Sequence, residues 1–265
     1  MKRQSRLDSL QEIIIRANST TIKDLAAQLN VSAMTIRRDM EVLESAGLVR
    51  TYRGGVIVAE RHARTGSASV YSLATAETAH VEEKREIAKA AASLVEPGDV
   101  IFFDAGSTVE LILDYVDPLL EMTIFCYSLN VLNLVAGRKN TRIVFSGGVY
   151  HPDSQNFESP EGLQLLNRNR SSKAFISANG IRADLGVTSS GQFEIPIKRA
   201  AIENSAHTYL IADSSKCGLV RTGHFADIED FDVIITDSGI STEAKEQLAE
   251  RGVELMIAAV GSADA

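Results

Sequence analysis

The chain has 265 residues, 45% of them hydrophobic and 23% charged, and its formal net charge is −8 at pH 7. That length accommodates two domains, and there is neither an apolar run near 18 residues nor an apolar signal-peptide core, so we expect a cytoplasmic protein that is neither membrane-spanning nor exported. Its two cysteines, Cys126 and Cys217, are too few for a disulfide framework or a metal set, and we expect no cofactor.

The charge is unevenly distributed along the chain. Residues 1–64 hold 11 basic and 7 acidic side chains, a net charge of +4, whereas the remaining residues hold 16 basic and 28 acidic ones, a net charge of −12. A positively charged segment is the electrostatic footprint of a nucleic-acid-binding domain, and an acidic body repels DNA from the wrong face. A DNA-binding surface is therefore expected in the N-terminal segment.

The first part of the chain predicts a helix-turn-helix. An amphipathic first helix is indicated by the apolar residues Leu7, Leu10, Ile13, Ile14 and Ala17. A second short helix is expected around residues 22–26, and a third follows a tight turn. In the third, Ile36, Met40 and Leu43 recur at i, i+4 and i+7, the spacing of a helix that packs one face on a core. Ser32 stands at the N-cap position of this helix, and Gly47 is expected to end it.

The other face of the third helix is basic, and a predicted hairpin follows it. Arg side chains in the first turns of such a helix can bind phosphates or the O6/N7 edge of guanine in the major groove. Residues 48–58 predict a strand, a Gly-Gly turn and a second strand, which form a wing beside the helix. The candidate DNA-binding residues are Ser32, Met34, Thr35, Arg37, Arg38, Arg50 and Arg53. A small helical domain with a solvated Arg-rich face is the less favoured alternative.

Residues 59–79 are poor in large apolar residues, which indicates a linker between domains at 1–58 and 80–260. A helix begins at Val81 and ends before Pro97-Gly98, and strand and helix patterns then alternate. This alternation favours an α/β fold with a mostly parallel sheet that is covered on both faces. The predicted strands are Val100–Asp104, Thr123–Tyr127, Arg142–Ser146, Ala174–Ala178, Thr208–Ala212, Val233–Thr236 and Glu254–Ala258. Helices are expected to start near Ser107, Asn130, Gly162, Ile197 and Thr242.

Polar and glycine residues follow the first three of these strands. Ligands of such sheets bind at the carboxyl ends of the strands, so three such ends on one edge indicate a phosphosugar pocket. We expect the Asp104 carboxylate to accept hydrogen bonds from sugar hydroxyls; the alternative is an ordinary turn with Ser107 as the N-cap. Asp213 and Lys216 follow a later strand, where they either close the pocket or form a surface contact. The candidate effector-binding residues are Asp104, Gly106, Ser107, Thr108, Ser128, Asn130, Gly147, Gly148, Asp213 and Lys216.

Three other groups of residues are weaker candidates. Asn179-Gly180 follows another strand, and His151 and His224 are isolated, so no metal site is indicated. Glu194 and Lys198 are four residues apart, which favours a simple surface pair on a helix.

The sequence resembles the DeoR-type bacterial transcriptional regulators over nearly its whole length. Residues 6–40 are similar to the helix-turn-helix signature of that family, and "HVEEKREIAKAAASLVEPGDVIFFDAGST", "CYSLN", "FSGGVYH" and "ADSSKCG" are similar to its sensor half. The resemblance implies a homo-oligomeric repressor of a sugar or nucleoside catabolic operon, with operator DNA and a phosphorylated sugar as partners. It also implies a sensor sheet like that of ribose-5-phosphate isomerase and coenzyme A transferases. The segment "YHPDSQNFESPEGLQ" is longer and more acidic than the family pattern, so the resemblance does not fix the ligand.

Two other classes of function remain as alternatives. An isomerase-like enzyme would need a base and a cation at the sugar, such as Asp104 or Glu194 with Lys216, but it would have no use for a positively charged N-terminal helix-turn-helix. A DNA-architectural protein with a passive second domain would bind DNA regardless of any metabolite. For the regulator we expect Arg37→Ala and Arg38→Ala to weaken DNA binding, and Asp104→Ala to leave a repressor that no longer responds to its effector.

Overall fold

The computed structural model describes residues 6–7, 9–11, 13–14, 19–52, 55–58 and 72–259. The chain divides into two compact units, residues 1–70 with 219–222, and residues 71–218 with 223–265. Within the described part of the chain, no helix has both the length and the apolar character that a membrane crossing requires.

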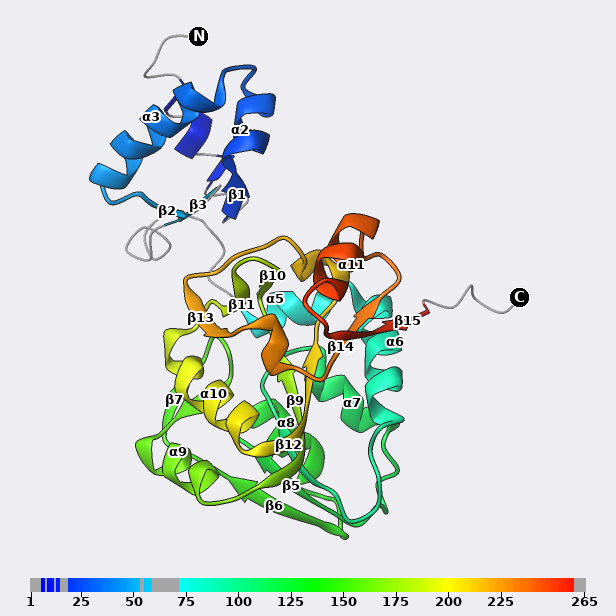
Figure 1. Ribbon diagram of the computed structural model, residues 1–265. Coiled ribbons are helices and arrows are strands. Elements are labelled where there is room, and N and C mark those ends of the chain that lie inside the picture. The colour runs from blue at the N-terminus through cyan, green and yellow to red at the C-terminus, as the bar shows by residue number, and fades with distance from the viewer. Residues whose placement is uncertain are drawn as a thin grey trace. The chain divides into compact units, whose positions relative to one another are not determined.

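The N-terminal unit is a winged helix-turn-helix. After a helical stretch between residues 6 and 14, strand β1 (Ser19–Thr21) leads into helix α2 (Ile22–Gln28) and helix α3 (Ala33–Ser45) (Figure 1). Strands β2 (Val49–Tyr52) and β3 (Gly55–Val58) form the predicted hairpin, and β1 adds to it to give an antiparallel sheet of order β1-β3-β2. The third strand was not predicted, because three residues are too few for a hydrophobic alternation to show.

Hydroxyl side chains cap the starts of the two helices of the motif, and a glycine follows the end of α3. Thr21 Oγ1 accepts a hydrogen bond from the Asp24 backbone at 3.0 Å, and Ser32 Oγ accepts one from the Thr35 backbone at 3.1 Å. Both hydroxyls are N-caps that satisfy backbone groups left free by the first turn. Gly47 follows α3 with a φ of +71°, a conformation that favours glycine, and the helix ends there as predicted.

The second unit is built on a seven-stranded parallel sheet, as the alternating pattern predicts. Its strand order is β15-β14-β12-β9-β4-β5-β6 (Figure 1). The strands are β4 (Val100–Phe103), β5 (Met122–Cys126), β6 (Thr141–Phe145), β9 (Ser171–Ser177), β12 (Ser205–Ile211), β14 (Val233–Asp237) and β15 (Glu254–Ala258). The helices are α5 (Leu73–Thr78), α6 (Val81–Ala92), α7 (Val109–Tyr115), α8 (Leu129–Val135), α9 (Pro160–Asn167), α10 (Ile195–Glu203) and α11 (Thr242–Ala249).

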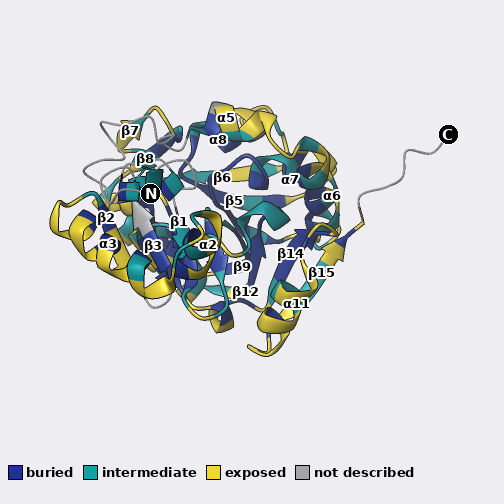
Figure 2. Ribbon diagram, turned by 90° about the horizontal axis from the view of Figure 1, so that it is seen from above, coloured by how far each residue is buried: buried dark blue, intermediate teal, exposed yellow. Residues whose placement is uncertain are grey.

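Helices cover both faces of this sheet, and a hydrophobic core lies under each layer. On one face, residues of α6, α7 and α8 pack with side chains such as Ile101 and Phe103. On the other, residues of α9, α10 and α11 pack with Phe102 and Ala174. The inner strands of the sheet are therefore largely buried between the helical layers (Figure 2), which explains the apolar runs that they contain in the sequence.

Several short elements lie beside the main sheet and were not predicted. Strands β7 (Val149–His151) and β8 (Asn156–Glu158) form a hairpin after β6. Strands β10 (Gly180–Arg182), β11 (Gly186–Ser189) and β13 (Gly223–Ala226) form a small antiparallel sheet. The single-turn 3₁₀ helices are η1 (Gln192–Glu194), η2 (Ser214–Lys216) and η3 (Ile228–Asp230).

Candidate functional site

Helix α3 exposes a basic face above a buried apolar stripe. Ile36 and Met40 are buried, as their spacing predicts, whereas Arg37 and Arg38 are exposed. Met34, on the first turn, is 58% exposed, a large value for an apolar side chain. Of the other predicted DNA-binding residues on this helix, Ser32 is exposed and Thr35 is half-buried. The face that would enter a major groove is therefore free of packing contacts within the N-terminal unit.

A buried ion pair, which the sequence analysis missed, holds α3 in place. Arg6 donates to both carboxylate oxygens of Asp39, from Nε to Oδ2 at 2.6 Å and from Nη2 to Oδ1 at 3.2 Å. Asp39 is 1% exposed and lies between Arg38 and the core residue Met40. A buried carboxylate needs a partner. The position of Asp39 next to the apolar stripe of α3 is the feature of the sequence that indicates a buried, paired carboxylate. The pair fixes the first helical stretch against the middle of α3.

The wing is hydrogen-bonded to the same helix. Thr51 of β2 donates from its backbone N–H to Glu44 Oε1 at 2.9 Å and from its hydroxyl to Oε2 at 2.7 Å. Arg50 is exposed on β2, whereas Arg53 lies outside the described residues. Glu44 therefore joins α3 to the wing strand that carries Arg50.

We expect the contact between the wing and α3 to depend on pH. The hydrogen bonds from the Thr51 backbone and hydroxyl lower the pKa of the Glu44 carboxyl. Because the folded-state pKa lies below the unfolded value of about 4.3, the contact is stabilising above that pH and is lost as the pH falls through the folded-state pKa. The Thr51 amide resonance should follow this titration in NMR spectra. Glu44→Gln should abolish the dependence, Glu41→Gln on the same helix should retain it, and a Thr51 resonance insensitive to acid would contradict the prediction.

In the second unit, the strand order reverses between β4 and β9. From β4 the chain adds β5 and β6 on one side, and from β9 it adds β12, β14 and β15 on the other. Open parallel sheets bind ligands outside the carboxyl ends of the strands at such a reversal. The three predicted polar strand ends belong to β4, β5 and β6, which are neighbours in the sheet, and Ser177 at the end of β9 joins them.

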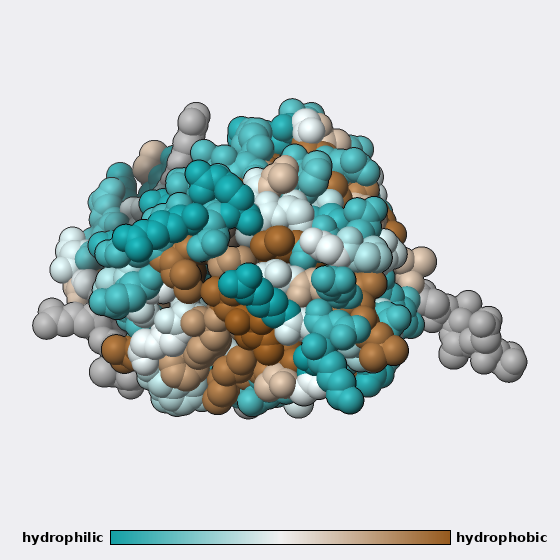
Figure 3. Space-filling view, turned by 90° about the horizontal axis from the view of Figure 1, so that it is seen from below, coloured by the Kyte–Doolittle hydropathy of each residue, from teal (hydrophilic) through white to brown (hydrophobic). Residues whose placement is uncertain are grey.

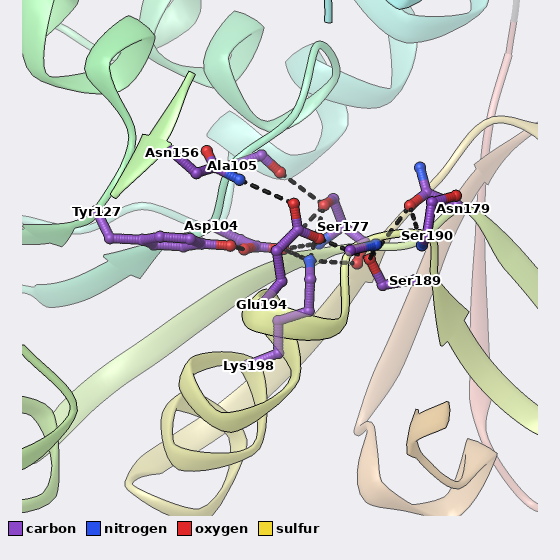
Figure 4. Close-up of polar contacts among 11 residues, drawn as sticks. Asp104, Ala105, Tyr127, Asn156, Ser177, Asn179, Ser189, Ser190, Glu194 and Lys198 are labelled. Carbon is purple, nitrogen blue, oxygen red and sulfur yellow. Dashed lines mark hydrogen bonds and ion pairs between the residues drawn. The ribbon is translucent and has the colours of Figure 1, made fainter. Parts of the chain in front are cut away.

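The predicted role of Asp104 as a hydrogen-bond acceptor for the ligand is wrong. Asp104 is fully buried, and its oxygens are taken by protein groups (Figure 4). Tyr127 Oη donates to Oδ1 at 2.6 Å, and the backbone and hydroxyl of Ser177 donate to Oδ2 at 2.7 and 2.8 Å. Lys198 also donates to Oδ2 in an ion pair. A buried charge needs such partners, so Asp104 holds the strand ends together instead of facing a ligand.

The prediction that Glu194 and Lys198 form a surface pair is also wrong. Lys198 is 1% exposed and pairs with Asp104, 94 positions earlier in the sequence. Glu194, which precedes α10, is 7% exposed and accepts hydrogen bonds from Asn156 Nδ2 at 2.8 Å and Ser189 Oγ at 2.6 Å. Burial raises the pKa of Glu194. The enzyme alternative needed Asp104 or Glu194 with Lys216, but the structure pairs Asp104 with Lys198 instead.

The loop after β4 is shaped by Gly106. Its φ of +128° favours glycine, and a Cβ there would lie 3.2 Å from both Cβ and Oγ of Ser177. Ser107 and Thr108 are each 7% exposed, and Thr108, at the start of α7, makes no side-chain cap hydrogen bond. The turn capped by Ser107, which was the alternative interpretation, is therefore not what the structure contains.

The ends of β5 and β6 carry the next predicted residues. Ser128 is fully buried, and its hydroxyl has no hydrogen-bond partner among the described residues. Asn130 donates its amide to Glu110. Gly147 has a φ of +57° and space around it, but a Cβ on Gly148 would lie 2.1 Å from the Glu158 carbonyl oxygen. The close approach predicted for Gly148 is therefore made to its own chain, at the β7–β8 hairpin.

Asp213 and Lys216 come together after β12, with a third residue nearby. Asp213 is 1% exposed, and its Oδ2 lies 3.5 Å from Lys216 Nζ without a hydrogen bond among the described residues. Lys84 of α6 is 2% exposed, and burial lowers its pKa, with Asp213, Lys216 and Glu110 among its charged neighbours. Lys84 belongs to the VEEKR segment, but no spacing in the sequence connects it with the strand ends.

Two family profiles match the chain. The DeoR-like helix-turn-helix domain matches residues 6–62, and the DeoR C terminal sensor domain matches residues 79–238. The deoxyribose operon repressor of Escherichia coli is 35% identical over 255 residues, which cover 96% of this chain and 98% of that protein. The lactose phosphotransferase system repressor of Staphylococcus epidermidis is 32% identical over 94% of this chain and 97% of that protein.

One solved structure similar to the chain is ribose 5 phosphate isomerase A from Neisseria gonorrhoeae. It is 18% identical over 53% of this chain and 54% of that protein, with a TM-score of 0.39. At that score, nothing about ligand or activity follows from the similarity.

Proposed function

The chain belongs to the DeoR family of transcriptional regulators, and from that premise we propose that it represses a sugar or nucleoside catabolic operon and is released by a phosphorylated sugar. It is a DNA-binding regulator and not an enzyme, because its relatives are named repressors and its N-terminal residues are a helix-turn-helix domain.

The observation that carries the DNA-binding proposal is the exposed basic face of α3. Arg37 and Arg38 are held outward by the buried stripe and by the Arg6–Asp39 pair beneath them. In this proposal Ser32, Thr35 and both arginines bind phosphates or base edges, and Met34 makes apolar contact, for which the thymine methyl is the natural partner. In the same proposal, the wing arginines Arg50 and Arg53 bind the phosphate backbone of the DNA.

The effector proposal places a sugar phosphate at the strand reversal. Lys84 and Lys216 provide positive charge there, and the buried Ser128 hydroxyl lacks a partner among the described residues. Asp104 supports the site without touching the ligand, and Gly148 shapes the hairpin beside it. The residues proposed to contact the ligand are Gly106, Ser107, Thr108, Ser128, Asn130, Gly147, Asp213 and Lys216. Because one relative is a deoxyribose operon repressor, deoxyribose 5-phosphate is our first candidate.

We also propose a homo-oligomer, because many helix-turn-helix proteins bind DNA as dimers on two half-sites. Two N-terminal units bound to half-sites about 34 Å apart, or a multiple of that distance, place their two recognition helices on one side of the duplex. Figure 3 shows the molecule from below, where hydrophobic residues lie on the surface among hydrophilic ones. Exposed apolar side chains of the second unit include Tyr115, Leu119, Leu134 and Leu165. We propose that apolar surface of this kind joins copies of the chain.

The test is a selection of duplexes from a random-sequence library by the full-length protein, followed by release with sugar phosphates. We expect an enriched, repeated half-site, and release by at least one of ribose 5-phosphate, 2-deoxyribose 5-phosphate and glucose 6-phosphate but not by inorganic phosphate. By linkage, DNA must weaken sugar-phosphate binding by the same factor. If no duplex is enriched, the DNA-reading proposal fails; if binding ignores every sugar phosphate, the second unit is passive.

Lys216→Ala should separate the two activities. We expect DNA affinity to stay native, because Lys216 lies in the second unit, and the sugar-phosphate concentration needed for release to rise about tenfold or more, as for loss of one charge-assisted hydrogen bond. Lys139→Ala, at an exposed position of that unit, is the control and should behave as the native chain. Native release by the Lys216 variant would remove this residue from the site.

A further inference from the structure

The β7–β8 hairpin is joined to the end of β5 by its backbone. Leu129 N donates to the Gln155 carbonyl at 2.8 Å, and Phe157 N donates to the Tyr127 carbonyl at 2.9 Å. Between these bonds, Ser128 and Asn156 form an antiparallel bridge. Paired residues of an antiparallel bridge project their side chains to the same side, with Cβ atoms about 5 Å apart. The Asn156 and Ser128 side chains are therefore neighbours.

Both side chains are fully buried, and each has an unpaired polar atom. Asn156 donates its amide Nδ2 to Glu194 Oε1 at 2.8 Å, and Ser189 donates to the other oxygen of that carboxylate (Figure 4). Asn156 Oδ1 and Ser128 Oγ have no hydrogen-bond partner among the described residues. A buried polar atom without a partner is unfavourable, so a group outside the protein chain is expected to satisfy these two.

The chemistry of the two atoms selects a hydroxyl group. Asn156 Oδ1 is a carbonyl oxygen and only accepts, whereas Ser128 Oγ can both donate and accept. One sugar hydroxyl placed between them can donate its proton to Asn156 Oδ1 and accept a hydrogen bond from Ser128 Oγ. A phosphate would have no proton for Asn156 Oδ1 when fully ionised, and the nearby Glu194 carboxylate disfavours an anion. The phosphate fits better beside Lys84 and Lys216.

We propose that Asn156, with Ser128, forms a subsite that reads one hydroxyl of the effector sugar and thereby selects which sugar phosphate the regulator senses. The inference rests on the proposed function, since it assigns part of the same effector site. Asn156 lies on β8, whose backbone is bonded to the end of β5, so the subsite adjoins the strand ends of the proposed effector site. A site built to hydrogen-bond a hydroxyl rejects analogues that lack it or present it differently.

The test compares affinities of the full-length protein for ribose, 2-deoxyribose, arabinose and xylose 5-phosphates, measured by calorimetry. Each of the other three probes differs from ribose 5-phosphate at a single carbon atom. For the native chain we expect the tightest binder to exceed an analogue altered at one carbon by at least tenfold. In Asn156→Ala that preference should shrink to within about threefold, and affinity for the tightest binder should fall at least tenfold.

Ser128→Ala is the second variant and removes the other unpaired atom with little change in shape. It should lose the same preference as Asn156→Ala, whereas Asn133→Ala, at an exposed position of α8, should keep it. Binding to the selected duplex without sugar reports that each variant is folded. If both site variants keep the native order of preferences, the unpaired atoms serve only an ordered water and the proposal is overturned. If the native chain itself binds no duplex, it is the proposed function that fails.

Discussion

Asp104→Ala is expected to destabilise the second unit by about 3–5 kcal/mol, the usual cost of removing one partner from a buried ion pair. Asp104 is fully buried and Lys198 is 1% exposed, so the variant would leave the Lys198 ammonium in the core without its counter-charge. Tyr127 and Ser177 would lose the acceptor of their hydrogen bonds as well. Urea unfolding of the full-length protein, followed by a signal from the second unit, measures the loss.

Two further variants establish whether the ion pair is the cause. Asp114→Ala removes an exposed carboxylate and should change the free energy of unfolding by no more than about 0.5 kcal/mol. Combining Asp104→Leu with Lys198→Met removes both charges and should recover part of the loss, because apolar groups can replace a buried ion pair at little net cost. A native-like stability of Asp104→Ala would show that the pair does not support the fold.

If Asp104→Ala destabilises the second unit, its failure to respond to the effector would have a structural cause. From the sequence, Asp104→Ala is expected to give a repressor that is folded but blind to its effector. In the structure the same change removes the ion pair that ties β4 to α10 and the hydrogen bonds to Tyr127 and Ser177. Failure of this variant to respond would therefore not locate the ligand. Lys216 and Asn156 are better probes, because neither is part of the Asp104 ion pair.

The main sheet could be predicted because each strand carries its own signal. Strands buried on both faces are short apolar runs, such as Val100–Phe103, and the seven predicted strands form the seven-stranded sheet. The recognition helix α3 could be predicted equally well, since its N-cap, its apolar stripe and its terminal glycine are all local features of the sequence. Strands of three residues, such as β7 and β10, are too short for such a pattern.

The polar contacts of the site could not be predicted from local sequence features. Lys198 reaches Asp104 across 94 positions, and Arg6 reaches Asp39 across 33, so no spacing connects the partners. The remaining signal is a charged residue within an apolar pattern, as for Lys198 in the segment IPIKRAAI. That pattern indicates a buried charge without naming its partner, which only the packing of the strands and helices determines.

Arg37→Ala and Arg38→Ala are each expected to weaken binding to the selected duplex by about 1–3 kcal/mol, roughly 5- to 150-fold. Both side chains are exposed on α3, so their removal should leave the fold unchanged. Sugar-phosphate affinity, measured without DNA, should also remain native. Arg168→Ala removes an exposed arginine from the second unit and is the matched control, with native DNA affinity expected.

The salt dependence of these variants distinguishes the two kinds of contact that an arginine makes with DNA. A residue that neutralises a phosphate releases a counterion on binding, so its loss should reduce the slope of log affinity against log salt by about 1 and weaken all sequences alike. A residue that binds a guanine edge should instead leave the slope nearly unchanged and relax the preference at one position of the half-site. If neither variant lost affinity at any salt concentration, α3 would not be the helix that reads DNA.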